Sequence, residues 1–223
     1  MILDEIVRST RERLRHLDQP VGDPDPLPRR SLGASIRTCG ERHAIIAEVK
    51  FASPSHGRIH DSCTPEAIAR EFVVAGAAGL SVLTEPTYFG GSPEFLVRVR
   101  RAVCVPILRK DFIVDVRQLG ETRALGADAV LLIARVLGDH LSTFVDGALA
   151  LGLEPLVEVH DRSEMERALA TNATLIGINN RNLETMMIDL STTVRLAGAA
   201  RDAGRIVVSE SGITWPYDVR SLS

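Results

Sequence analysis

The chain has 223 residues, 45% of them hydrophobic, which is enough to bury one large core. Its 26 basic and 29 acidic residues give a formal net charge of -3 and are spread along the sequence, so neither a nucleic-acid-binding stripe nor an acidic tail is expected. No apolar run approaches the roughly 18 to 20 residues of a membrane span, and the three widely spaced cysteines suit a reducing compartment, so we expect a cytoplasmic protein. We also expect it to bind a small molecule and to be a monomer or a weak homo-oligomer.

The first element is an amphipathic helix. Apolar residues recur at helical spacing over residues 2–17, and the resulting stripe must lie on another surface, as a lid or a brace. Four closely spaced prolines then predict an extended connector over residues 18–31. We expect a single domain, with the helix and connector in residues 1–40 and a barrel in residues 41–223.

From about residue 43 onward, one unit repeats along the chain. Each repeat has a short β-branched run, a polar loop, a stretch of helical periodicity and a turn of small residues. Gly or Asn at these turns is typical of a helix end, and the apolar run that follows is typical of a buried parallel strand. The seven expected strands cover approximately residues 44–49, 79–84, 104–109, 128–133, 154–158, 174–178 and 205–209.

Parallel strands joined by helices allow two architectures, an open doubly wound sheet or a closed (β/α)8 barrel. A dinucleotide-binding open sheet usually carries GxGxxG after its first strand, whereas this first strand leads into EVKFASPSHG. Charged and polar residues instead follow several different strands, which is typical of the catalytic face of a barrel. We therefore predict an α/β protein with the fold of a (β/α)8 TIM barrel.

Three strand ends carry candidate catalytic groups. Glu48 and Lys50 lie two apart at the end of the first strand, so both face the barrel mouth, although a solvated salt bridge is the alternative. Lys110 ends the third strand beside an apolar run and Phe112, and these surroundings are expected to lower the pKa of its ammonium. Glu158 closes the strand EPLVEV, where apolar neighbours are expected to raise its pKa.

Polar loops also follow the sixth and seventh strands. Asn179 and Arg181 lie in GINNRNL, and Glu210, Ser211 and Gly212 lie in VVSESGI. Backbone N–H groups after the seventh strand commonly bind phosphate in such barrels, although a tight turn is the simpler interpretation of SGI. Five of the seven strands thus end in a residue capable of acid, base or anion chemistry, and chance would scatter such residues.

Seven segments resemble, in order and in spacing, the strand-end motifs of the indole-3-glycerol-phosphate synthase family. They are IIAEVKFASPSHG, SVLTEPTYFGGS, PILRKDFIVD, GADAVLLIARVL, LEPLVEVH, GINNRNLET and VVSESGI. The resemblance extends over residues 1–223. The first helix is similar to the family's extra N-terminal helix, which lies across the barrel mouth and helps to enclose the substrate.

The resemblance implies the conversion of 1-(2-carboxyphenylamino)-1-deoxyribulose 5-phosphate to indole-3-glycerol phosphate, with loss of carbon dioxide and water, in tryptophan biosynthesis. By analogy, Lys110 donates a proton to the ribulose carbonyl oxygen as the aromatic ring attacks. Lys50, Glu48 and Glu158 are the candidates for the acid and the base of the dehydration. Which carboxylate is the base stays open at this point.

Other residues have binding roles in the same analogy. Lys50 also pairs with the substrate carboxylate, and Asn179 and Glu210 hold hydroxyls and orient the lysines. The remaining expected substrate contacts are Ser53 in the first loop, Phe89, Phe112 and Leu131 around the aromatic ring, and Arg181, Ser211 and Gly212 at the phosphate. The reaction implies no metal and no organic cofactor, and the six histidines have no HExxH or HxH spacing.

The sequence departs from the family pattern in two places. Phe51 stands where the family usually has a basic or other polar residue, which predicts altered packing of the first loop and altered kinetics. The sequence ends at DVRSLS, whereas the family continues with an eighth strand, a Gly-Ser phosphate loop and a final helix. We therefore expect an open barrel that lacks these elements, is poorly stable, and is weakly active or inactive.

Two other functions are compatible with the sequence. One is a different phosphosugar barrel enzyme, such as an isomerase or a Schiff-base aldolase with Lys110 as its nucleophile. The other is an inactive truncated remnant that pairs its open edge with a partner, although every matching site position up to Ser211 is retained.

Overall fold

The computed structural model describes residues 2–15, 27–40, 43–54, 57–59 and 63–222. Its central sheet has seven parallel strands in the order β1-β4-β5-β6-β7-β8-β9. They are β1 (Ile46–Val49), β4 (Gly79–Leu83), β5 (Ile107–Lys110), β6 (Ala129–Ile133), β7 (Glu154–Val159), β8 (Leu175–Asn179) and β9 (Ile206–Glu210). All seven predicted strands are confirmed, with ends that differ from the prediction by a few residues.

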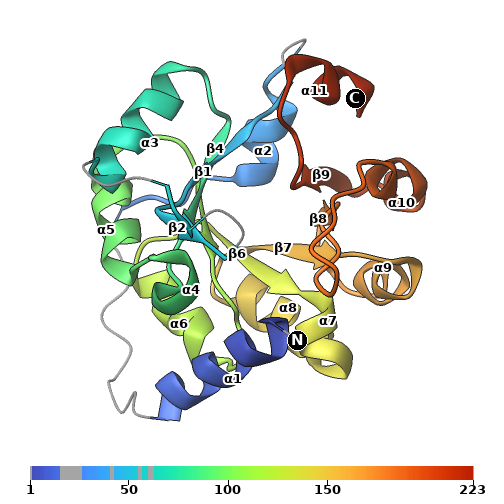
Figure 1. Cartoon of the computed structure of the whole chain (residues 1–223), viewed down its shortest axis with the longest axis horizontal. Helices are drawn as coiled ribbons and strands as arrows, with labels where there is room; N and C mark the ends of the chain where they lie inside the picture. Colours follow the sequence, from blue (N-terminus) through green and yellow to red (C-terminus); the bar gives the residue numbers. More distant parts are fainter. Residues whose placement is uncertain (1, 16–26, 41–42, 55–56, 60–62, 223) are drawn as a thin grey trace.

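Helices connect successive strands and cover the outer face of the sheet (Figure 1). The longer ones are α3 (Pro65–Val74), α5 (Pro93–Ala102), α6 (Arg117–Ala124), α8 (Leu141–Ala150), α9 (Arg162–Leu169) and α10 (Ser191–Asp202). Short helical turns are α4 (Pro86–Phe89), α7 (Ala134–Leu137), the 3-10 turn η1 (Gly138–His140) and α11 (Pro216–Ser221). Two helices precede the sheet, α1 (Ile2–Arg15) and α2 (Leu32–Arg37).

Polar caps fix where several helices begin. The Thr64 hydroxyl accepts a hydrogen bond from the backbone N–H of Ala67 at the start of α3, and Asp161 accepts one from Glu164 at the start of α9. Each cap satisfies a backbone donor that has no partner within the first turn of its helix. The loop residues after the strands are thereby tied to the helices that follow them.

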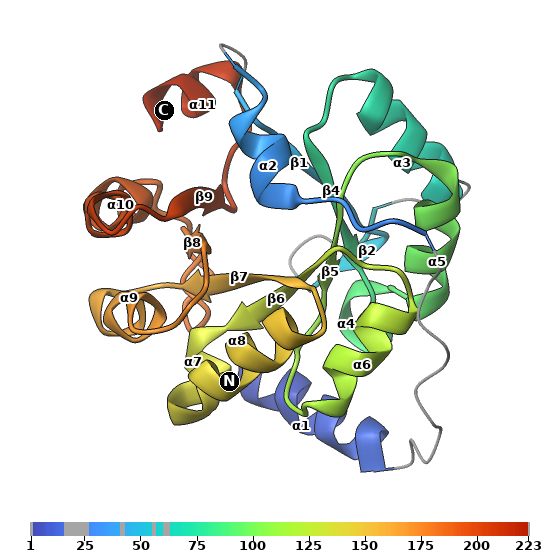
Figure 2. The same cartoon turned by 180° about the vertical axis from the view of Figure 1, so that it is seen from behind.

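The helix α2 closes the end of the sheet at which the strands begin (Figure 2). Its first residue, Leu32, is fully buried in the inner core with Leu156 and Leu175. Glu154, at the start of β7, accepts hydrogen bonds from the backbone N–H groups of Leu32 (2.6 Å) and Gly33 (3.0 Å). This end is packed with apolar side chains, so a ligand site is left to the opposite end.

The sheet curves into a half-barrel. Within the described ranges, β1 pairs only with β4 and β9 pairs only with β8. Side chains of both edge strands line a cavity of about 620 Å³. The fold is therefore a parallel α/β half-barrel of seven strands, consistent with a TIM-barrel-like architecture.

The first loop contains structure that the sequence analysis did not predict. A two-stranded antiparallel hairpin, β2 (Ala52–Ser53) with β3 (Gly57–Arg58), follows β1. The predicted first helix is confirmed over Ile2–Arg15. Residues 16–26, which hold the end of that predicted helix and most of the predicted connector, lie outside the described residues. None of the helices in the described ranges has the length and hydrophobicity needed to cross a bilayer.

Candidate active site

The carboxyl ends of the strands surround a cavity of about 410 Å³. The predicted site residues that line it are Glu48, Lys50, Ser53, Phe89, Lys110, Phe112, Leu131, Glu158, Asn179, Arg181 and Ser211. Glu210 and Gly212 line the adjoining cavity between β1 and β9, which also contacts Glu48, Lys50 and Lys110. The fold thus brings all the predicted site residues to one end of the sheet.

Lys110, the last residue of β5, lies between two carboxylates, Glu158 with 3% of its side chain exposed and Glu210 with 13%. Its Nζ is 3.0 Å from Glu210 Oε2 and 3.5 Å from Glu158 Oε2. Together with Glu48 they come from the first, third, fifth and seventh strands of the sheet, and alternate strands of a barrel contribute side chains to the same layer. Lys110 is therefore a neighbour of Glu158 and Glu210 in one layer of the interior, although they lie 48 and 100 residues further along the chain.

The surroundings of Lys110 raise the pKa of its ammonium. Burial has the largest single effect and lowers that pKa, as predicted. The negative charges of Glu210, Glu158 and Glu48 act in the opposite direction, and together they outweigh burial. The predicted lowering of the Lys110 pKa is therefore wrong, because the strand sequence alone does not reveal the carboxylates that converge on the amine. Lys110 is an ammonium ion at neutral pH.

The two carboxylates beside Lys110 differ from each other. Burial alone raises the pKa of Glu158, but Lys110 and His160 outweigh burial and lower that pKa to about 2, so the predicted rise is wrong. For Glu210, burial and the nearby Glu158 charge prevail over Lys110, and its pKa is raised to about 7. At neutral pH Glu158 is therefore ionised, whereas Glu210 is present in both its protonated and its ionised form.

The pair at the end of β1 borders the same cavity. Lys50 Nζ donates to Glu48 Oε1 at 2.5 Å, and both side chains are about one-third exposed. The prediction that they face the same side is confirmed. They form an ion pair, as in the solvated-salt-bridge alternative, but that ion pair is part of the cavity lining.

The end of β8 connects the acid–base cluster to the next loop. Asn179 Nδ2 donates to Glu158 Oε1 at 3.2 Å, and Asn179 Oδ1 accepts the backbone N–H of Arg181 at 3.0 Å. The Arg181 guanidinium donates to the backbone carbonyl of Met186, whose side chain also lines the cavity. A cationic side chain is thereby held at the rim, where it can meet an anionic part of a ligand.

The turn after β9 has an unusual backbone. Ser211 (φ 66°) and Gly212 (φ 82°) are consecutive residues in the left-handed region, which non-glycine residues rarely occupy. A Cβ at residue 212 would also overlap the side chain of Ile188. Both the left-handed backbone and this close packing require glycine at that position. The tight-turn interpretation of SGI is correct, and turns of this kind expose backbone N–H groups that can bind an anion.

The apolar wall of the cavity comes from several elements. Phe89 and Phe112 face each other with ring centroids 6.1 Å apart, and Leu131 of β6 adds to the same lining. Sequence analysis did not predict the contributions of Ile2, Leu3 and Ile6 from α1, Ile59 from the first loop, or Leu183 and Met186 from the loop after β8. The helical stripe of α1 was the available signal, but periodicity does not identify the surface on which a stripe packs.

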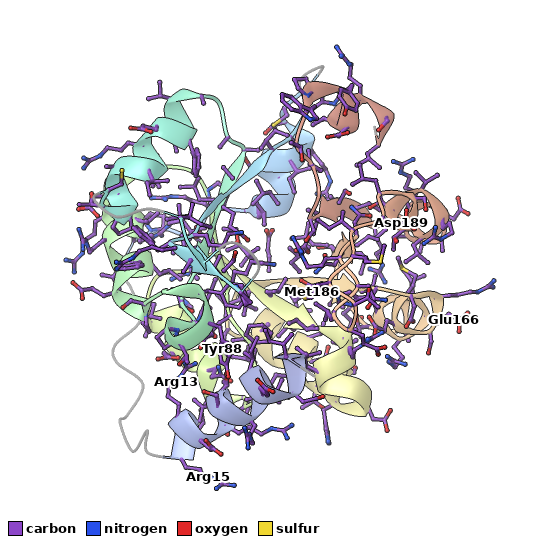
Figure 3. All side chains as sticks on the ribbon, viewed as in Figure 1. Arg13, Arg15, Tyr88, Glu166, Met186 and Asp189 are labelled. Carbon is purple, nitrogen blue, oxygen red and sulfur yellow. The ribbon has the colours of Figure 1, made fainter. Side chains whose placement is uncertain are left out.

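An arginine fastens α1 over the cavity. Arg13 lies 3.6 Å from Glu85 and 3.7 Å from Asp111, two carboxylates that are almost fully buried. Figure 3 shows Arg13 on the side of α1 that faces Tyr88 of α4, whereas Arg15 points away from the molecule. Asp111 directly follows Lys110, so α1 is tied to the rim beside the central amine.

No cluster of three or more His, Cys, Asp or Glu side chains with the arrangement of a metal site occurs among the residues that the structure describes. The cavity does combine two amines, several carboxylates, an amide, a guanidinium and an apolar wall. This combination suits proton transfer to and from an aromatic, anionic ligand.

Comparison with known proteins gives one consistent result. A family model described as "Indole-3-glycerol phosphate synthase" matches residues 3–223. Proteins named indole-3-glycerol phosphate synthase include one from Azospirillum brasilense, 47% identical over 82% of this chain and 70% of its own length. Another, from Carboxydothermus hydrogenoformans, is 41% identical over 100% of this chain and 89% of its own length. A third, from Geobacillus thermodenitrificans, is 43% identical over 99% of this chain and 86% of its own length.

Proposed function

The chain belongs to the indole-3-glycerol phosphate synthase family, whose members are decarboxylating, ring-closing lyases of tryptophan biosynthesis, and from this premise we propose how its own residues carry out the reaction. The substrate is 1-(2-carboxyphenylamino)-1-deoxyribulose 5-phosphate. Ring closure, loss of carbon dioxide and loss of water then give indole-3-glycerol phosphate. None of these steps changes the overall oxidation level, so acids, bases and oriented charges suffice.

One observation supports the assignment more than any other. The sequence contains 26 basic residues besides histidine, but only two of them, Lys50 and Lys110, are lysines. Both amines line the same cavity, and each contacts a carboxylate there. An ammonium can release a proton, whereas an arginine guanidinium cannot. The two basic side chains best suited to proton donation are therefore together at the proposed reaction centre.

Lys110 is the proposed acid of the first step. As the aromatic ring carbon attacks the ribulose carbonyl, negative charge develops on the carbonyl oxygen, and the Lys110 ammonium transfers a proton to it. A raised pKa does not prevent this transfer, because an alkoxide is a strong base. The substrate carboxylate then leaves as carbon dioxide, and its electron pair restores the aromatic ring. Glu210, 3.0 Å from the Lys110 amine, is a source from which that amine regains its proton.

The dehydration needs one acid and one base. The new hydroxyl leaves as water after it accepts a proton, for which Lys50, paired with Glu48, is the proposed donor. A carboxylate removes the proton from the adjacent carbon, and Glu48 and Glu158 are both candidates. Two protons are taken up and one is returned, and the net uptake of one proton balances the negative charge of the substrate carboxylate, which leaves as neutral carbon dioxide.

The remaining site residues are proposed to hold the substrate. Lys50 pairs with the substrate carboxylate until decarboxylation, and Asn179 holds a sugar hydroxyl. The proposed ring contacts are Phe89, Phe112 and Leu131, the proposed phosphate contacts are Arg181, Ser211 and Gly212, and Ser53 is a further contact of the first loop. Aromatic and aliphatic contacts orient the anthranilate ring, and hydrogen bonds and a guanidinium suit a phosphate.

We also infer the finer architecture from the family. The seven strands belong to a single-domain (β/α)8 barrel, with α1 as the extra N-terminal helix over its mouth. The cavity between β1 and β9 is the place in which an eighth strand of that fold lies. The family's role in biosynthesis indicates the cytoplasm as its location.

Two substitutions at Lys110 test the mechanism in the full-length protein. Lys110→Met removes the proton and the charge, whereas Lys110→Arg keeps the charge beside Glu158 and Glu210 without a transferable proton. We expect both to lower the kcat for ring closure by roughly 100-fold or more. Arg162→Met, at an exposed position of α9, is the control that leaves the rate unchanged. Turnover by Lys110→Met at the parental rate would refute the proposed acid.

A further inference from the structure

A series of charged side chains lies behind Glu158, outside the residues that line the cavity. His160 Nε2 is 3.3 Å from Glu158 Oε1, and His160 Nδ1 is 3.0 Å from Glu164 Oε2. Arg135 Nε then donates to Glu164 Oε1 at 2.7 Å. The series runs from the end of β7 through the first turn of α9 to α7, and among the residues that the structure describes Glu158 is its member that lines the cavity.

The position of His160 between two carboxylates fixes its charge. Nδ1 is hydrogen-bonded to Glu164, and Nε2 lies 3.3 Å from Glu158 Oε1 at ion-pair distance without a hydrogen bond among the described residues. Two carboxylates this close to the ring favour its doubly protonated, positively charged form. The side chains of His160, Glu158 and Glu164 are each 6% exposed or less. Burial lowers the pKa of His160, but the two carboxylates outweigh burial and raise it to about 9. His160 is therefore an imidazolium at neutral pH.

The backbone holds this imidazolium in one orientation. Glu164 Oε2 also accepts the backbone N–H of His160 at 2.8 Å, so the carboxylate that binds the ring is tied to the same residue. The backbone N–H of Glu164 in turn donates to the cap residue Asp161 at 2.8 Å. These bonds leave the ring little freedom to turn away from Glu158.

The two carboxylates beside Lys110 have unequal partners. Glu158 Oε1 accepts from Asn179 Nδ2 and faces His160, while its Oε2 faces Lys110. Glu210 Oε2 contacts Lys110, but its Oε1 is buried with no hydrogen-bond partner among the described residues. A buried negative charge is stable where cations and donors surround it, and a buried oxygen without a partner favours the neutral acid.

We propose that His160 is a positioning residue that makes Glu158, rather than Glu210, the ionised carboxylate beside Lys110. Glu158 is then ready to accept a proton from the substrate, and Glu210 retains one for Lys110. The effect of His160 on catalysis rests on the proposed function. The division of charge between the two carboxylates is a property of the protein without substrate.

The groups that face His160 come from four elements. They are Glu158 and Asp161 at the end of β7, Glu164 in α9, Arg135 in α7 and, through Arg135, Glu184 in the loop after β8. Arg135 neutralises the negative charge of Glu164. The positive charge of His160 therefore stabilises mainly the ionised form of Glu158. Removal of the imidazolium takes from Glu158 a cation that Glu210 does not contact, and leaves it with Lys110, which it shares with Glu210.

The first test measures the charge of His160 without any assay of activity. Nitrogen NMR of the six histidine rings, with His160→Asn to assign the signal, is expected to show one ring that stays doubly protonated up to about pH 9. Glu164→Gln is expected to lower the pKa of that ring by at least 1 unit. Glu166→Gln removes an exposed ion pair on the same helix and is expected to leave it unchanged. A His160 ring with an ordinary pKa near 6.5 would overturn the proposal.

The second test follows the two carboxylates. Carbon NMR of glutamate side chains, assigned with Glu210→Gln and Glu158→Gln, is expected to show a titration near pH 7 for Glu210 and none above pH 4 for Glu158. In His160→Gln and His160→Asn, neither of which carries a charge, the Glu158 pKa rises by about 1 to 3 units and the Glu210 pKa falls. Unchanged titrations of both residues in folded variants would overturn the proposal.

Kinetics connect the charge division to catalysis. In both His160 variants we expect kcat to fall roughly tenfold and the pH–rate limb near pH 7 to move by about 1 unit, with KM within twofold of the parent. A merely structural defect lowers the rate by the same factor at every pH. If Lys110→Met remained active, the proposed acid would fail while the NMR result stood. If the NMR titrations were ordinary, the inference would fail while the synthase activity stood.

Discussion

Glu210 Oε1 occupies the space directly beside Gly177, where a side chain at that position would have its Cβ. Gly177 is the central residue of β8, and its partner in the ladder is Val208, two residues before Glu210. The missing side chain at residue 177 is what allows the Glu210 carboxylate to lie on the inner side of the half-barrel and reach Lys110. A glycine in the middle of a buried strand, which ordinarily weakens a sheet, thus has a specific role.

Gly177→Ala is therefore expected to displace Glu210 without disrupting the sheet. The added methyl group overlaps a carboxylate at the end of a side chain, so the side chain turns away and the ion pair with Lys110 lengthens. We expect kcat to fall roughly tenfold, with a change in unfolding free energy of no more than about 2 kcal/mol. Gly198→Ala in α10, where a Cβ has open space, is the matched control. Equal activities of the two variants would contradict this role of Gly177.

The scarcity of lysine permits a direct measurement of the Lys110 charge. Protein labelled with carbon-13 at the lysine ε position gives two signals, from Lys50 and Lys110, and Lys110→Met assigns them. The three carboxylates raise the Lys110 pKa above its ordinary value of 10.5, so its signal is expected to stay that of an ammonium at pH 10.5. In Glu210→Gln one carboxylate charge is gone, and we expect the pKa to fall by about 1 unit or more. Half-deprotonation of Lys110 below pH 10 would disagree with the observed geometry.

The sequence identified the strands and their ends because hydrophobic runs and turn residues are local signals. Lys110 and Glu158 were predicted as site residues, and the structure brings them to one cavity, but both pKa directions were wrong. The apolar neighbours were visible in the sequence, whereas the charges that outweigh burial come from other strands. His160, in the VEVH segment, lies two residues from Glu158 and could have been suspected, but its partner Glu164 and that residue's partner Arg135 belong to two helices.

Glu210 should make the stability of the fold depend on pH in a specific direction. Its pKa is about 7 in the folded chain and 4.5 as the ordinary value, so the folded state holds its proton more tightly than the unfolded state. Between these two pH values only the unfolded chain loses the proton, and stability therefore falls as pH rises from about 4.5 through about 7. Glu210→Gln has no proton to lose and escapes this decrease.

Unfolding by denaturant at several pH values checks this expectation. The difference in unfolding free energy between Glu210→Gln and the parent should shift in favour of the variant by on the order of 1 to 3 kcal/mol between pH 4.5 and pH 8. Activity should be reduced at every pH, because the variant has no proton to return to Lys110. A stability difference that stays constant over this range would mean that Glu210 titrates normally in the folded chain.

Arg13 attaches α1 to the rim of the cavity through Glu85 and Asp111, so a substitution of Arg13 can loosen this helix. Glu85 already accepts three backbone N–H groups at the start of α4, and Asp111 accepts from Thr84, Arg109 and the backbone N–H of Phe112. Both carboxylates therefore keep donors when Arg13 is removed. Arg13→Ala is expected to cost no more than about 1 kcal/mol of stability, and its main effect falls on the position of α1.

Because Leu3 and Ile6 line the cavity, a looser α1 exposes this candidate site to water. In Arg13→Ala we expect faster amide hydrogen exchange within α1 and a KM raised roughly threefold to tenfold, with a smaller change in kcat. Arg15→Ala, on the same helix but directed away from the molecule, is the control and should match the parent (Figure 3). If exchange in α1 accelerates while KM stays constant, the helix is a brace for the half-barrel and does not help to enclose the ligand.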